Sequence, residues 1–326
     1  MDAIEQDTWL WLDRHHLVDN DAMRRHMIRA RPQYTSALYW PRTDVSHLRA
    51  CNWYMNWAFI VDDALDDAIS MHDHARVARV TDDLIGVAYG VKESSTYAER
   101  GLEEIIYSFS VGRSSQWRWL MGETHKDWLR TYPIEARAND MGRRMRFAEY
   151  VPHRASGVNE RIFMHLNEYV RDIDLPSEIR NLPAMTQARD RAVEWVGLYN
   201  DIYSFVKEDA VGYRYNAVAV VRDELHCSVQ EAVDIVGMVL DGLIDQFQAA
   251  CAAVPAQARA VVGRERDVSD MAMQTLEGYK QTVRGNFDYH IDTPRYTEVS
   301  DYMPPSQTAV DNRRPDWSTF DIFSIY

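Results

Sequence analysis

The stretch NDIYSFVKE, residues 200–208, places three oxygen-bearing side chains four residues apart. On an α-helix, Asn200, Ser204 and Glu208 lie along one face, one turn apart. Their amide, hydroxyl and carboxylate oxygens are ligands that a hard cation such as Mg²⁺ prefers. A solvated polar stripe would have the same spacing, but Asn and Ser are unfavourable inside a helix and need another reason to be there. The stretch therefore predicts a helix with a metal-binding face.

A second group of carboxylates lies well upstream, within the segment DDALDD at residues 62–67. Asp62 and Asp66 are four residues apart, so they share a helix face, with Asp63 beside them. The preceding residues 53–61 are almost wholly apolar, and carboxylates that end a buried helix are costly unless a cation compensates them. The alternative is a solvated acidic helix end. Together the two clusters predict metal ions held between two helices, with an anion bound to the metals.

Helical periodicity dominates the chain, and no alternating strand pattern, repeat or low-complexity tract interrupts it. The 14 Gly and 11 Pro are too few for an all-β fold with many turns. We therefore expect an all-α fold. Ser228, followed three residues later by Glu231, predicts a helix start. The predicted helices span residues 49–69, 136–151, 158–171, 187–208, 228–252 and 256–288, with short proline-marked connections at 131–135 and 174–185.

Length and composition predict one folded unit. The 326 residues are 46% hydrophobic, enough for a sizeable core, and no shift in composition marks a linker. We therefore expect a single α-helical domain over residues 1–326. The end of the chain, residues 300–326, is broken by prolines and predicted to be irregular. Its apolar last residues either pack back onto the body or are mobile.

The net charge of −14 argues against a nucleic-acid partner, which usually requires a basic face. It also argues against diffuse adhesion to anionic membranes. An anionic substrate is still compatible with this charge, because bound metal ions reverse the local sign.

Three widely spaced cysteines without metal-ligand spacing favour a reducing compartment. The acidic N-terminal residues lack the features of a secretory signal or a transit peptide. No apolar stretch of 18 residues stands out, so no membrane span is expected. We therefore expect a cytoplasmic protein, as a monomer or a homodimer.

With both clusters in view, the chain resembles a class I terpene synthase of the compact, single-domain bacterial and fungal type. That family carries an aspartate-rich motif on one helix and an Asn-Asp-x-x-Ser-x-x-x-Glu motif on another. The first corresponds here to Phe59-x-x-Asp62-Asp63-x-x-Asp66, and the second to residues 200–208. The resemblance implies a helical bundle around an apolar active-site cavity.

Two further family features have counterparts in this sequence. An arginine that senses the substrate diphosphate typically lies about 46 residues before the motif's asparagine, and Arg154 holds that place. Near the C-terminus the family has an Arg-Tyr pair after a Gly-Asn segment, which corresponds to Arg295-Tyr296 after Gly285-Asn286. The resemblance therefore covers most of the chain.

The resemblance implies an isoprenyl diphosphate as substrate and three Mg²⁺ ions that bridge it between the two helices, with Mn²⁺ as a substitute. By family analogy, Asn200, Ser204 and Glu208 bind one ion. Asp62 binds the other two, and Asp66 is a further candidate ligand.

Positive side chains are expected to complete the diphosphate site. Arg154, Lys207 and Arg295 would supply charge to the leaving group, and Tyr296 would donate a hydrogen bond. Asp63 is expected to pair with an arginine such as Arg295 when the site closes. These four donors are the expected substrate-binding groups for the diphosphate.

A carbocation needs a dry pocket with aromatic faces. Phe59, one turn before Asp62, and Tyr289 are the aromatic residues expected to line it; ordinary core packing is the expectation for the others. Gly157 is expected at the helix break that follows the sensor arginine in this family, because glycine tolerates unusual dihedral angles. Pro152 removes one helical hydrogen bond, so the break is expected to begin earlier than usual.

The predicted reaction is Mg²⁺-dependent ionisation and cyclisation of farnesyl diphosphate, which yields a sesquiterpene hydrocarbon or alcohol. Geranyl or geranylgeranyl diphosphate are alternative substrates. The enzymatic rival is a chain-elongating prenyltransferase, which usually carries two aspartate-rich motifs. The Asn, Ser and Glu of the second motif disfavour it. A non-catalytic helical scaffold with solvated acidic faces is the alternative from another class.

Overall fold

The computed structural model describes residues 2–210, 212–262, 266–296 and 322–323, in which every regular element is helical. The all-α prediction is therefore confirmed. The first eight helices are α1 (Asp2–Arg14), α2 (Asp21–Ala30), α3 (Pro32–Tyr39), α4 (Val45–Ser70), α5 (His74–Ala88), α6 (Tyr97–Ser110), α7 (Ser115–Leu129) and α8 (Thr131–Asp140). The others are α9 (Phe147–Gly157), α10 (Glu160–Tyr169), α11 (Ser177–Arg180), α12 (Pro183–Ala210), α13 (Ala217–Leu225), α14 (Val229–Val262), α15 (Arg266–Asp292) and the 3₁₀ helix η1 (Pro294–Tyr296).

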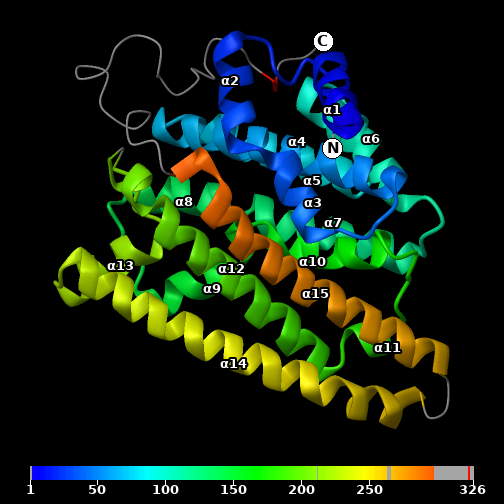
Figure 1. Cartoon of the computed structure of the whole chain (residues 1–326). Helices are drawn as coiled ribbons and strands as arrows, with labels where there is room; N and C mark the ends of the chain where they lie inside the picture. The colour runs from blue at the N-terminus through cyan, green and yellow to red at the C-terminus, as the bar shows by residue number, and fades with distance from the viewer. Residues whose placement is uncertain (1, 211, 263–265, 297–321, 324–326) are drawn as a thin grey trace.

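The helices form two packed groups (Figure 1). In one, the long helices α12, α14 and α15 run side by side. In the other, α4 packs against α1, α3, α5 and α6. Helix α8 contacts α4 and α5, α9 and α10 contact α12, and α9 also contacts both α8 and α10, so these three helices connect the two groups. The two helices that carry the oxygen motifs, α4 and α12, thus belong to different groups.

Each group has its own apolar core. Tyr54 and Trp57 of α4 are fully buried, and the indole of Trp57 donates to the carbonyl of Ala98 at 2.8 Å. Val193 and Val196 of α12 are buried in the second core. Burying a large aromatic or aliphatic side chain stabilises the fold by about 1.5–3 kcal/mol, so these cores hold α4 and α12 firmly.

Helix ends are where the prediction and the structure agree most closely in detail. The hydroxyl of Ser228 accepts from the amide of Glu231 at 3.3 Å, and the carboxylate of Glu231 accepts from the amide of Ser228 at 2.8 Å. This reciprocal pair is a capping box, and it confirms the predicted helix start. The carboxylate of Asp44 accepts from the amides of Ser46 and His47 and starts α4 in a similar way.

Prolines account for the main errors in the predicted boundaries. The predicted helix 136–151 is wrong, because the segment belongs to α8 and α9, with a turn between them. The predicted connection 131–135 is helical, since its proline lies in the first turn of α8, where the missing amide hydrogen costs little. The predicted break before residue 256 is also wrong: α14 continues through Pro255, and the next helix starts at residue 266.

One helix passes a length and composition test for a membrane span. It is the part of α14 from Val229 to Val261, with a mean hydropathy of 1.3 over its most apolar window. The sequence-based expectation had not singled out this stretch. One such helix is weak evidence for a span, and this one packs along α12 and α15, with 33% of that window buried.

The predicted irregular tail, residues 300–326, lies outside the described residues except for Ile322 and Phe323. Ile322 is buried, and its carbonyl accepts from the amide of Ala98 at 2.9 Å. Phe323 packs against the core that contains α4.

Acid is expected to destabilise this protein through buried neutral histidines. His125 is fully buried on α7, and burial lowers its pKa to about 4. Between pH 6.5 and 4 the unfolded chain takes up a proton that the folded chain does not. The stabilisation that depends on neutral His125 is therefore complete above pH 6.5 and is lost as pH falls towards 4. Urea unfolding at pH 7.5 and 5.0 measures the effect. The free energy of unfolding should fall between these pH values by about 2 kcal/mol less in His125→Gln than in the wild type.

The exposed His226 supplies the matched control. His226→Gln should reproduce the wild-type difference between the two pH values. An equal pH dependence in the wild type and His125→Gln would contradict the assignment.

Candidate functional site

A cavity of about 600 Å³ opens between the two helical groups. Acidic, basic and aromatic side chains line it together. All predicted site residues except Tyr289 belong to its wall, which comprises Ala58, Phe59, Asp62, Asp63, Asp66, Ile69, Ser70, Trp128, Thr131, Tyr132, Glu135, Asn139, Arg154, Gly157, Val158, Asn159, Phe163, Asn200, Ser204, Lys207, Glu208, Gly212, Tyr213, Arg214, Tyr215, Arg295 and Tyr296.

The α4 side of the cavity presents three carboxylates. Asp62 accepts a hydrogen bond from the hydroxyl of Tyr132 at 2.5 Å. Burial and the neighbouring Asp63 raise the pKa of Asp62. Asp63 is buried, and its Oδ2 lies 2.9 Å from Nε2 of His26, on α2. A raised pKa is the direction expected of a carboxylate whose ionised form a bound cation would stabilise.

The α12 side presents the second oxygen set, and one asparagine organises it. Nδ2 of Asn216 lies 3.3 Å from the hydroxyl of Ser204 and 2.9 Å from Oε2 of Glu208. It also donates to the backbone carbonyl of Asp201 at 2.8 Å. Asn216 is fully buried and its own Oδ1 caps α13 by accepting from the amide of Val218. It therefore holds Ser204 and Glu208 at fixed positions along the cavity wall.

Arg154 joins α9 to α12 through two side chains. Its Nε donates to Oδ1 of Asp201 at 2.9 Å, and its Nη2 donates to Oδ1 of Asn200 at 2.8 Å. Asp201 is fully buried and also accepts from Tyr150 at 2.6 Å and from the amide of Ala217 at 2.9 Å. Burial raises the pKa of Asp201 to about 6, and Arg154 opposes that rise. The arginine is thus positioned by a buried carboxylate.

The amide of Asn200 is oriented from its other side by α15 and η1. Its Nδ2 donates to Nε2 of His290 at 3.0 Å and to the hydroxyl of Tyr296 at 2.9 Å. Nδ1 of His290 donates to the carbonyl of Asn286 at 2.8 Å. Burial lowers the pKa of His290 to about 4, so the ring is neutral and its Nε2 can accept. This arrangement directs Oδ1 of Asn200 towards Arg154.

Arg295 and Lys207 add positive charge to the wall. The guanidinium of Arg295 lies over the ring of Phe59, 4.6 Å from its centroid. Such a stacked arginine keeps a defined direction. Phe59 therefore supports Arg295 as well as contributing to the cavity wall.

The helix break near Arg154 differs from the expected one. Helix α9 passes through Pro152 and ends at Gly157, so the break does not begin early. The turn falls at Val158 and Asn159, and Asn159 adopts a left-handed conformation with φ of 61°. A single proline removes only one backbone hydrogen bond, and the neighbouring helices hold the rest of the turn.

Tyr289 was wrongly expected to line the cavity. Its side chain is buried between α15 and α2, and its hydroxyl donates to the carbonyl of Ala30 at 2.6 Å. Trp195 and Tyr199, near the second motif, also lie outside the wall and stack on each other with centroids 4.6 Å apart. Residues that share a helix with the site can still point to a different face, which explains this error.

The donor set fits hard cations. Asn200, Ser204 and Glu208 offer three kinds of oxygen on one helix face, and Asp62 and Asp66 offer carboxylates on another. Amide and hydroxyl oxygens accept more than one interaction, so their present hydrogen bonds leave capacity for a cation. An all-oxygen set without thiolate or imidazole favours Mg²⁺ or Mn²⁺ over softer metals.

Comparison with known proteins identifies the family. Residues 54–246 match the model of terpene synthase family 2, C-terminal metal binding, which is more than half of the chain. The chain belongs to the terpene synthase family. It is accordingly an enzyme of the lyase type, with the class I all-α fold.

Individual relatives agree with this family. This terpene synthase is 29% identical over 235 residues to (2Z,6E)-hedycaryol synthase from Kitasatospora setae, which covers 72% of this chain and 69% of the relative. It is 26% identical over 297 residues to (-)-delta-cadinene synthase from Streptomyces clavuligerus, which covers 90% of both chains.

Solved structures share its fold. The structure of hedycaryol synthase in complex with HEPES superposes with a TM-score of 0.80 at 23% identity, over 90% of this chain and 93% of the other. Wild-type cucumene synthase gives a TM-score of 0.78 at 20% identity, over 90% and 96%.

Sequence reasoning missed several residues of the site, including four that hold other side chains in place. Tyr132 and Glu135 lie in the segment interpreted as a connection, and His26 belongs to α2, which no motif marked. Asn216 precedes an apolar helical run, and this N-cap position was the signal that could have found it. Glu135 accepts from Tyr213 at 3.1 Å and lies 2.7 Å from Nε2 of His153, so it links α8 to α9 and to the segment after α12.

Asn216→Ala in this terpene synthase is expected to lower kcat about 10- to 100-fold, the range typical of groups that orient metal ligands. The reason is that Ser204 and Glu208 lose the amide that positions both of them. Asn216→Ser keeps a residue that caps helices well but cannot span to Glu208, so it should lose turnover with little loss of stability. Steady-state kinetics measures the turnover of each variant, and urea unfolding measures its stability.

Ser114→Ala is the matched control, because Ser114 caps α7 in the same way and does not line the cavity. It should lose stability without losing kcat. Wild-type turnover in both Asn216 variants would contradict the positioning role.

Proposed function

We propose that this terpene synthase ionises and cyclises farnesyl diphosphate in a Mg²⁺-dependent reaction and releases a sesquiterpene hydrocarbon or alcohol together with diphosphate. The observation that carries the proposal is the convergence of both oxygen motifs, four cationic side chains and an aromatic wall on one cavity of about 600 Å³. The relatives support the choice of substrate: one is named 7-epi-alpha-eudesmol synthase, farnesyl diphosphate cyclizing, from Streptomyces viridochromogenes.

In this proposal the diphosphate lies at the polar end of the cavity. Three Mg²⁺ ions, when bound, would supply positive charge that stabilises the leaving group. Asp62 and Asp66 would hold them on the α4 side. Asn200, Ser204 and Glu208 would hold them on the α12 side.

The cationic residues would bind the diphosphate directly. Arg154, Lys207 and Arg295 would donate to its oxygens, and Tyr296 would add the hydrogen of its hydroxyl, whose oxygen already accepts from Asn200. Charge placed before the reaction where negative charge will develop lowers the barrier to C–O cleavage. Asp63, which contacts His26 in the structure, would serve to position Arg295 when the site closes.

The aromatic wall would receive the cation. Phe59, Trp128, Tyr132 and Phe163 line the cavity. Their faces attract positive charge, and their apolar surface disfavours water that would quench the reaction early. Gly157, at the end of α9, leaves room beside Thr131 on this wall.

Separate incubation with geranyl, farnesyl and geranylgeranyl diphosphate, each with Mg²⁺, tests the proposal by gas chromatography–mass spectrometry. Farnesyl diphosphate should give cyclic products of fifteen carbons. A parallel reaction with added isopentenyl diphosphate tests chain elongation. If that reaction gives a longer prenyl diphosphate and none of the other reactions gives a cyclic product, the enzyme is a prenyltransferase instead.

A further inference from the structure

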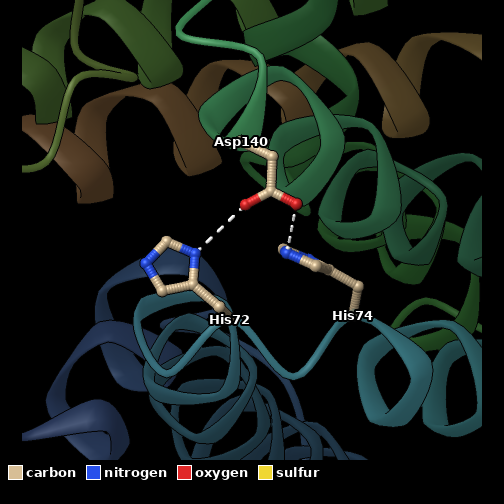
Figure 2. Close-up of side chains that lie close together, drawn as sticks. All are labelled: His72, His74 and Asp140. Atoms are coloured by element: carbon tan, nitrogen blue, oxygen red, sulfur yellow. Dashed lines mark hydrogen bonds and ion pairs between the residues drawn. The ribbon is translucent and has the colours of Figure 1, made fainter.

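A cluster of two histidines and one aspartate lies outside the cavity wall (Figure 2). His72 lies in the tight turn between α4 and α5, His74 is the first residue of α5, and Asp140 is the last residue of α8. Their candidate ligand atoms all lie within 4.8 Å of one another. Neither motif of the diphosphate site includes any of the three.

The geometry suits a tetrahedral metal ion. Nδ1 of His72 lies 3.1 Å from Oδ1 of Asp140, and Nε2 of His74 lies 2.6 Å from Oδ2. Ligands bound tetrahedrally at zinc distances lie about 3.3 Å apart. Both separations are of this order, and the two imidazoles approach opposite oxygens of one carboxylate, so a rotation of that carboxylate would present one oxygen to both nitrogens. Two imidazoles and a carboxylate leave the fourth position to water, a frequent zinc arrangement.

The environment of His74 supports a ligand role. Both of its ring nitrogens are shielded from solvent, and neither forms a hydrogen bond of regular geometry with the described residues, although Nε2 pairs with Asp140. Figure 2 shows both rings directed towards the carboxylate. A bound cation would satisfy a nitrogen that the described side chains leave poorly satisfied.

The backbone also favours a cation at this point. Helix α4 ends at Ser70 and α8 ends at Asp140, so two helix C-termini with partial negative charge lie near the cluster. His72 itself adopts a left-handed conformation, with φ of 60°. The start of α5 at His74 opposes this field in part, but the ionised carboxylate of Asp140 adds a full negative charge.

We propose that His72, His74 and Asp140 form a Zn²⁺ site separate from the Mg²⁺ motifs. The imidazole nitrogens select Zn²⁺ over Mg²⁺, which prefers oxygen ligands. Bound Zn²⁺ would join the turn after α4 to the end of α8. The neighbouring residues Ser70 and Asn139 line the cavity, so the Zn²⁺ site would lie at the edge of that cavity.

Calorimetric titration of tag-free, chelator-dialysed, full-length protein with Zn²⁺ tests the site without any measurement of activity. We expect one binding event, at least tenfold weaker in His72→Ala and in Asp140→Asn. The event should persist in the double variant Asn200→Ala/Ser204→Ala, because that variant alters only the cavity motif. Thermal unfolding should show a Zn²⁺-dependent rise in Tm that follows the same pattern.

His226→Ala is the matched control for His72→Ala. Both histidines are exposed and left-handed at a helix C-terminus, with φ of 53° and 60°. The control should keep wild-type Zn²⁺ affinity. Wild-type affinity in both His72→Ala and Asp140→Asn would overturn the proposal, and so would loss of the event in the double variant alone.

Discussion

Replacement of Asn200 and Ser204 together by alanine is expected to lower kcat with farnesyl diphosphate at least about 1,000-fold, since removal of a single preorganised stabilising group already costs 10²–10³. Glu208 alone would remain of the oxygen set on α12. Asn200 also loses its bonds to Arg154 and Tyr296, so the cationic side of the cavity loses its alignment as well.

Calorimetry with pyrophosphate and Mg²⁺ separates loss of binding from loss of folding. We expect the heat of binding to disappear in the double variant, while its circular dichroism and Tm change little in comparison. Gln187→Ala, on the exposed face of the same helix, should behave like the wild type. Turnover within tenfold of the wild type in the double variant would contradict the metal assignment.

Arg154→Gln is expected to lower both the free energy of unfolding and kcat. Asp201 is fully buried and would lose its charged partner, a change that typically costs 3–5 kcal/mol. Protonation of Asp201 would relieve part of the cost, because its pKa already lies near 6 and would rise further. The folded variant would then bind a proton that the unfolded chain does not, so its stability should fall as pH rises from 5.5 to 8.

A double-mutant cycle with Asp201→Asn separates the two effects. Arg154→Gln/Asp201→Asn should be less destabilised than the sum of the single changes, since no buried charge remains unpaired. Its turnover should stay low, because no guanidinium is available for the diphosphate. Recovery of both stability and turnover in the double variant would show that Arg154 serves only to neutralise Asp201.

The helical architecture was predictable because periodic apolar residues report directly on burial. Helices α4 and α12 were recognised within a few residues of their ends, since both combine an apolar stripe with a distinctive polar face. The capping box of Ser228 and Glu231 was predictable for a similar reason: it is a local interaction between residues three apart.

Two features were not predictable in the same way: prolines that lie inside helices, and contacts between side chains far apart in the sequence. Pro152 and Pro255 lie inside helices that neighbouring helices stabilise, and this tertiary support cannot be detected in a short window. The contacts of Tyr132 with Asp62 and of Asn216 with Glu208 depend on how the chain folds. Short motifs name the ligands, but the residues that orient those ligands come from other helices and loops.

Tyr289 illustrates the limit of analogy. It occupies a place near the C-terminal Arg-Tyr pair, yet its hydroxyl bonds to Ala30 in the core instead of facing the cavity. A rotation of one residue along α15 changes its direction by about 100°, so sequence spacing alone cannot assign its face.

Release of pyrophosphate from farnesyl diphosphate, measured in Mg²⁺ and again after addition of a chelator, decides whether the enzyme ionises this substrate with the help of the metal. We expect steady release in Mg²⁺, accompanied by a cyclic sesquiterpene, and no release with the chelator. Release that persists without divalent metal, or no release from any of the three prenyl diphosphates in Mg²⁺, would contradict the proposed function.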